Sequence, residues 1–176
     1  MTFKDVKREL IQLENDKLVA LLGELYKKNK DVKEYLDFLV APNERKLYEK
    51  YEDKLYLAFF PARGHNYNLT TAKKAISDFK KAGATPELVA ELTLYYLETG
   101  ASYALEYGEI GENAYTSFEK SFVAMLEIMD KGGFLNKFHE RIVTLINDTK
   151  DIGLGDVFYF PYQDLTEFDQ TIYEDK

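Results

Sequence analysis

The sequence predicts an all-α fold, and three observations support this. Apolar residues recur at three- and four-residue steps along most of the chain, the spacing of one helix face. Prolines and glycines divide this pattern into segments, and no strand pair with a hairpin turn occurs before residue 152. We therefore expect about eight helices in antiparallel hairpins, forming either a closed bundle or a short solenoid-like superhelix.

Four helices are expected before Pro61. Their apolar stripes run over residues 3–13, 18–26, 32–40 and 47–59. Asn15-Asp16 and Asp31 suit the starts of the second and third helices. Pro61 ends the fourth helix, because proline lacks an amide donor and biases its neighbour away from helix.

Four more helices are expected over residues 69–82, 86–107, 112–131 and 135–146. Thr85-Pro86 suits an N-cap followed by a first helical residue. The segment after it is apolar on nearly every face, which predicts the central, most buried helix. Gly100 in that helix marks either a break or a close approach of a neighbouring helix.

The end of the sequence has a different composition. Residues 153–176 combine acidic residues with several phenylalanines and tyrosines, whereas disordered acidic tails are poor in aromatics. We predict a single helical domain over residues 1–152. We expect the following segment to pack on it in extended form through about Tyr162, with the last residues fraying.

Composition excludes several kinds of site and location. The 176 residues include no cysteine and two histidines far apart, so we expect no metal site and no cofactor. The opening MTFKDVKREL is too charged for a signal peptide, and no apolar run is long enough to cross a membrane. These features predict a cytoplasmic protein that does not bind membranes.

Charge is divided unevenly along the chain. Residues 1–81 carry 17 Lys/Arg and 13 Asp/Glu, whereas residues 82–176 carry 6 and 18. The net charge of −8 disfavours wholesale nucleic-acid binding, which usually needs a basic excess. A local basic patch in the first half is still compatible with the sequence. Its candidate residues are Lys27, Lys28, Lys30, Lys33, Arg63, Lys73, Lys74, Lys80 and Lys81.

One internal similarity is present. Residues 18–26 and 88–96 agree at five of nine positions with an offset of 70. Two helical hairpins of about 35 residues each would produce this offset, as in helical repeat proteins. Chance similarity between two leucine-rich amphipathic helices is the simpler explanation, because no other segment shows this period.

The loop after Pro61 is the main candidate for a binding site. Arg63, His65 and Tyr67 lie just before a helix start, and Lys73 follows in the first turns of that helix. A helix N-terminus with cationic neighbours suits a phosphate or carboxylate. The alternative is structural: Asn68 or Thr70 caps the helix while Arg63 and His65 connect the loop to neighbouring acidic groups.

A second candidate is an acidic set around residues 98–112, consisting of Glu98, Glu106, Glu109 and Glu112. Paired carboxylates can bind a divalent cation or act as acid and base. Capping of a helix start by glutamate is the simpler interpretation. Four tyrosines at the edges of apolar stripes are expected to be partly exposed: Tyr48, Tyr56, Tyr67 and Tyr95.

The sequence resembles a family of small bacterial proteins defined only as a domain of unknown function. The resemblance lies in AKKAISDFKK (72–81), LYYLExG (94–100), YGEI (107–110) and YxS (115–117), and the opening residues 9–39 are similar too. It covers residues 3–130 and implies an all-helical fold. It implies no activity and no catalytic residues.

Three functions are compatible with these features. We favour a module that binds another protein, because no catalytic signature accompanies the helical hairpins and charge asymmetry. The first alternative is a binder of nucleic acid or an anionic ligand through the basic patch. The second is an enzyme that acts on an anionic substrate near Arg63 and His65.

Overall fold

A computed structural model describes residues 1–64, 66–108 and 110–166. Within these residues the chain forms nine α-helices and one 3₁₀ helix, and no strand is present. The chain groups into two compact units. Unit 1 comprises Met1–Asn43 with Lys81–Gly83, and unit 2 comprises the other described residues. The all-α prediction is confirmed.

Unit 1 contains helices α1 (Phe3–Ile11), α2 (Asn15–Lys28) and α3 (Lys30–Val40). The start of α1 is a capping box, in which the Thr2 backbone N–H donates to the Asp5 carboxylate at 2.8 Å. Asn29 caps α3, because its side-chain oxygen accepts from the N–H groups of Asp31 and Val32. Helices α2 and α3 pack against each other.

Unit 2 contains six helices. They are α4 (Glu44–Phe59), α5 (Leu69–Lys81), α6 (Pro86–Tyr107), α7 (Glu112–Gly132), α8 (Leu135–Thr149) and α9 (Leu154–Thr166), with the 3₁₀ helix η1 (Lys150–Ile152) before α9. The last residue of α5, Lys81, is grouped with unit 1. Thr85 caps α6 and Pro86 is its first residue, as predicted. Gly133 ends α7 with a left-handed backbone, φ 71°.

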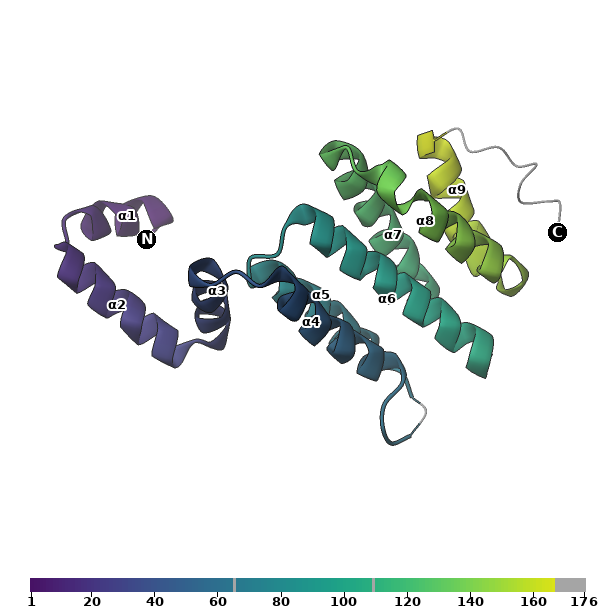
Figure 1. The fold of residues 1–176 in the computed structure, drawn as a ribbon, viewed down its shortest axis with the longest axis horizontal. Helices are drawn as coiled ribbons and strands as arrows, with labels where there is room; N and C mark the ends of the chain where they lie inside the picture. Colours follow the sequence, from purple (N-terminus) through teal and green to yellow (C-terminus); the bar gives the residue numbers. More distant parts are fainter. Residues whose placement is uncertain (65, 109, 167–176) are drawn as a thin grey trace. The chain divides into compact units, whose positions relative to one another are not determined.

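The helices of unit 2 stack as three pairs, α4–α5, α6–α7 and α8–α9 (Figure 1). Helix α6 contacts α4 on one side and α8 on the other, while α7 contacts α9. The rings of Tyr48 and Tyr51 on α4 pack on Phe79 of α5. Stacked pairs of this kind correspond to the solenoid-like alternative rather than to a closed bundle.

Helix α6 is the central helix, as predicted. Leu92, Leu94 and Leu97 are completely buried, and polar residues such as Thr93 are buried beside them. The helix continues through Gly100, where an added Cβ atom would collide with the Phe118 ring of α7. Of the two expectations for Gly100, the close helix approach is confirmed and the break is wrong.

The expectation of an extended segment after residue 153 is wrong for residues 154–166, which form helix α9. Leu154, Phe158 and Tyr162 recur every four residues and are buried, so a helix places all three against α7 and α8. Pro161 lies inside this helix, where the packing offsets the missing amide donor. The fraying expected of the last residues, 167–176, lies outside the described residues.

Candidate functional site

Helices α1, α2 and α3 contain no buried residue. Some of their large apolar side chains are half-buried and many are exposed: Phe3 is 77% exposed, Val19 66%, Leu22 48% and Leu39 62%. We call the exposed apolar residues of these helices the unit 1 apolar surface; they are Phe3, Val6, Ile11, Val19, Leu21, Leu22, Leu25, Tyr35, Leu39 and Val40. Amphipathic helices usually gain most of their stability by burying such a face.

Polar contacts connect α2 and α3. The Tyr26 hydroxyl donates to Asp37 Oδ1 at 2.7 Å, and Lys33 Nζ donates to the Tyr26 oxygen at 2.7 Å. These bonds lower the pKa of Asp37 and raise the pKa of Lys33. Exposed hydrogen bonds thus join α2 and α3 in addition to the packing of the two helices.

The predicted binding loop is described in part. Arg63 is exposed in the turn after α4, and Gly64 beside it has a positive φ of 81°. Lys73 is exposed on α5. His65 lies outside the described residues, so an anion site formed by these side chains stays a prediction.

Tyr67, the fourth residue of that candidate site, packs within unit 2. Its ring lies 5.0 Å from that of Tyr103, between centroids, and its hydroxyl oxygen accepts from the Gly111 N–H at 3.3 Å. Asn68 caps α5, since its side-chain oxygen accepts from the Thr71 N–H at 2.8 Å. Asn68 therefore caps the helix, as the structural alternative expected, and Tyr67 has a packing role that neither interpretation predicted.

The predicted basic residues are distributed over both units. Several form ion pairs with neighbouring carboxylates, which reduces the positive charge available to an anion. The pairs are Lys28–Glu24, Lys33–Asp37, Lys74–Asp78 and Lys81–Asp31, with N–O distances from 2.8 to 3.6 Å.

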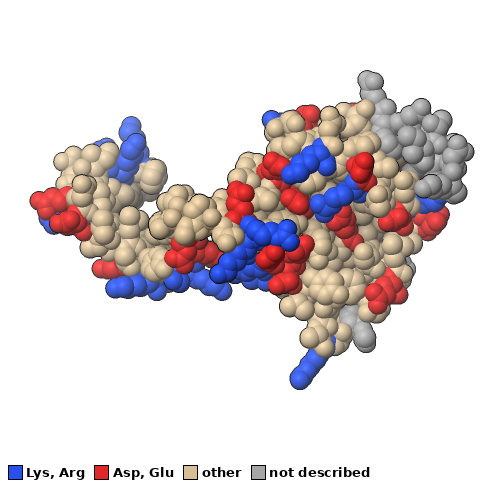
Figure 2. All heavy atoms as spheres, viewed as in Figure 1, with Lys and Arg blue, Asp and Glu red and all other residues tan. Residues whose placement is uncertain are grey.

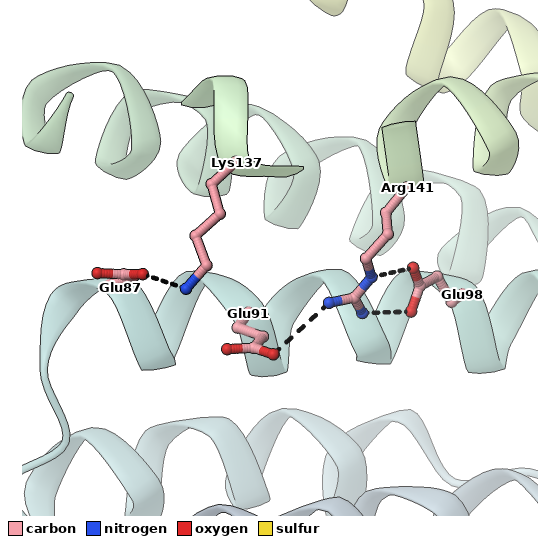
Figure 3. Close-up of polar contacts among 5 residues, drawn as sticks. All are labelled: Glu87, Glu91, Glu98, Lys137 and Arg141. Carbon is pink, nitrogen blue, oxygen red and sulfur yellow. Dashed lines mark hydrogen bonds and ion pairs between the residues drawn. The ribbon is translucent and has the colours of Figure 1, made fainter. Parts of the chain in front are cut away.

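The predicted acidic residues have separate environments. Glu98 on α6 forms a two-pronged pair with Arg141 on α8: the guanidinium donates to both carboxylate oxygens, at 2.9 and 2.7 Å (Figure 3). Glu106 is exposed near the end of α6, and Glu112 lies in the first turn of α7. Glu109 lies outside the described residues.

Arg141 belongs to a larger charged contact between α6 and α8. It also lies 3.7 Å from Glu91, and Lys137 pairs with Glu87 at 2.5 Å (Figure 3). Burial opposes the charge on Arg141, but the hydrogen bonds to Glu98 and the nearby carboxylates outweigh it and raise its pKa. Figure 2 shows this face, where Lys and Arg side chains of unit 2 lie among Asp and Glu.

The four tyrosines that were predicted to be partly exposed are partly exposed in the structure. Tyr56 is 48% exposed, and Tyr48, Tyr67 and Tyr95 are half-buried. Burial, together with the negative charge of Glu91, raises the pKa of Tyr48. Tyr48, Tyr56 and Tyr95 therefore each have only part of the side chain accessible to solvent, whereas Tyr51 and Tyr96 on the same helices are fully buried.

Sequence reasoning missed two features of these surfaces. It gave no indication that apolar side chains of α1–α3 are exposed, because a stripe alone does not show what covers it. It also missed the Glu98–Arg141 pair, since 43 residues separate the partners and no local spacing connects them. Both features depend on how helices meet in space.

Two special features are absent from the part of the chain that the structure describes. No group of three or more His, Cys, Asp or Glu side chains among the described residues is arranged to hold a metal ion. Over the same residues, none of the helices combines the length and apolar character needed to cross a membrane.

Comparison with known proteins identifies a family. A protein-family model matches residues 1–154, so the match includes the three helices of unit 1 and continues to the first residue of α9. No curated protein and no solved structure matches the sequence. The chain belongs to DUF6155, a family of unknown function.

Proposed function

We propose that this protein is an interaction module that binds another protein through the unit 1 apolar surface. One observation carries the proposal: three amphipathic helices fully bury none of their residues and expose many of their large apolar side chains. Exposed apolar patches beyond a few hundred Å² are typical of protein interfaces. Contact with a partner would supply the burial that these helices lack.

The partner surface that fits is itself apolar and carries few charges. Unit 1 has nine Lys/Arg and eight Asp/Glu, so its charges nearly cancel. Many of these charged groups already pair with neighbours on the same helix, such as Lys28 with Glu24. Apolar contacts rather than net charge would therefore determine the affinity, which would depend weakly on salt.

The test is capture of partners from the host lysate with tagged full-length protein, with and without nuclease. The variant Val19→Ser/Leu22→Ser removes two exposed apolar side chains of α2. We expect a stoichiometric, nuclease-resistant protein partner whose affinity falls roughly tenfold or more in this variant.

The matched control is Leu57→Ser/Val123→Ser, which removes two exposed apolar side chains of unit 2. It should retain the partner, and circular dichroism should show unchanged helix content in both variants. Retention of the partner by the α2 variant, or its loss with nuclease, would contradict the proposal.

The nucleic-acid and enzyme alternatives stay predictions, as do a cytoplasmic location and a bacterial origin. A nucleic-acid ligand would bind with a steep salt dependence, because phosphate contacts release counterions. Loss of the captured partner with nuclease would therefore favour that alternative.

A further inference from the structure

A groove of about 540 Å³ lies along α6 in unit 2. The rings of Tyr56, Phe60, Tyr95 and Tyr107 line it, together with the carboxylates of Glu98 and Glu106. No lysine or arginine is among the described residues that line this groove. Its volume lies within the range of pockets that bind small ligands or side chains.

Several polar atoms of this groove accept hydrogen bonds, while the phenol groups of its tyrosines both donate and accept. Thr99 Oγ1 donates to the Tyr95 carbonyl and Ser102 Oγ to the Glu98 carbonyl, at 2.7 and 2.9 Å. Each hydroxyl proton is thereby used within the helix, and lone pairs are left for a ligand. Glu106 adds a carboxylate, which only accepts when ionised and is hydrogen-bonded to the Tyr107 side chain. Both oxygens of Glu98 already accept from Arg141. A ligand rich in donors fits this lining.

The rings provide a surface for a cation. Tyr56 and Phe60 stack with their centroids 5.1 Å apart, and Phe60 lies 6.3 Å from Tyr107. Tyr56 and Tyr107 are nearly half exposed, so their faces are accessible. Ammonium and guanidinium groups bind such faces, and most strongly where a carboxylate lies nearby.

The groove continues into a second hollow of about 420 Å³ between α6 and α8, with which it shares Glu98 and Ser102. Glu140 and Asp148 are exposed on the α8 side of that hollow. Arg141 is its only cation among the described residues, and Glu98 already binds it. The two hollows together suit an extended ligand with several positive charges rather than a compact one.

We infer that this groove binds a basic peptide segment of a partner protein. One lysine or arginine side chain lies against Tyr56, Phe60 and Glu106, and a second lies near Glu140 and Asp148. Charge complementarity and cation–π contact provide the recognition. This inference concerns unit 2 alone and does not depend on the unit 1 apolar surface.

The experiment measures binding of a fluorescein-labelled nona-arginine peptide to the full chain by fluorescence anisotropy, with a nona-glutamate peptide as the negative probe. We expect arginine-peptide binding that weakens with salt and no glutamate-peptide binding. Glu106→Gln should weaken binding roughly fivefold. Tyr56→Leu should weaken it similarly, whereas Tyr56→Phe, which keeps the ring, should not.

The matched control is Glu127→Gln, which removes one exposed carboxylate of α7 outside the groove. It changes the net charge as much as Glu106→Gln and should leave the affinity unchanged. Equal weakening by both variants would overturn the inference, because general attraction to an acidic protein would then explain binding. If unlabelled spermidine displaces the labelled peptide as strongly as unlabelled peptide does, the assignment of the ligand to a peptide would be overturned.

Discussion

At the scale of single residues, Gly100 has the most closely defined role. Phe118 is fully buried against it, and three atoms of that ring lie where a Cβ atom would have to fit. The absence of a side chain therefore permits the close approach of α6 and α7. Gly23 on α2 provides the contrast, because a Cβ there would meet no atom within 4 Å.

We predict that Gly100→Ala lowers the free energy of unfolding by about 1–3 kcal/mol, because the buried ring has little room to move. Urea unfolding followed by circular dichroism measures this change. Gly23→Ala should not lower the midpoint, since alanine favours helix by about 0.5–1 kcal/mol. Equal effects of the two substitutions would show that Phe118 does not constrain position 100.

At the scale of the elements, helices α6 and α8 are joined by packing and by charge. The Glu98 and Arg141 side chains are about one-third exposed, and both carboxylate oxygens accept from the guanidinium. The Glu127–Lys131 pair within α7 is much more exposed, at 60% and 75%. A pair that is partly removed from water should contribute more to stability than an exposed one.

We predict that Glu98→Gln destabilises the protein by about 1 kcal/mol, since it leaves Arg141 with only the more distant carboxylate of Glu91. Glu127→Gln should change stability by no more than about 0.5 kcal/mol. Chemical denaturation of both variants at low and high salt provides the comparison. A loss for Glu98→Gln no greater than for Glu127→Gln would contradict a stabilising role of the α6–α8 pair.

At the scale of the whole molecule, the two units differ in how their helices are stabilised. Helix α6 has twelve buried residues, whereas α1, α2 and α3 have none. Local caps and exposed hydrogen bonds open at much lower free energy than a packed core. The units should therefore differ in their protection from hydrogen exchange.

We predict that backbone amides of α1–α3 exchange with little protection and that those of α6 and α7 approach the global stability of the fold. Hydrogen–deuterium exchange with peptide-resolved mass spectrometry tests this. Addition of a partner that binds the unit 1 apolar surface should slow exchange in α2 and leave α6 unchanged. Equal protection of α2 and α6 in the free protein would contradict the difference between the units.

Much of the fold followed from local signals. The spacing of apolar residues predicted the helices through Thr149, and Thr85-Pro86 correctly predicted the start of α6. Helix α9 was missed because the acidic and aromatic composition of this segment favoured an extended tail. The four-residue spacing of Leu154, Phe158 and Tyr162 indicates a helix instead. Of the candidate site residues, Tyr67 has a packing role that the loop sequence alone did not show.

The sequence by itself determined the helices, most of their ends and the central position of α6, because capping and apolar periodicity act between residues close in the chain. Only the tertiary structure decided which apolar stripes are covered and which charged groups meet. Helices α1–α3 and α4 all have apolar residues at three- and four-residue steps. Of these four helices, however, only α4 has buried residues. Burial and long-range pairing depend on which helices come together in space, and one helix's sequence does not contain that information.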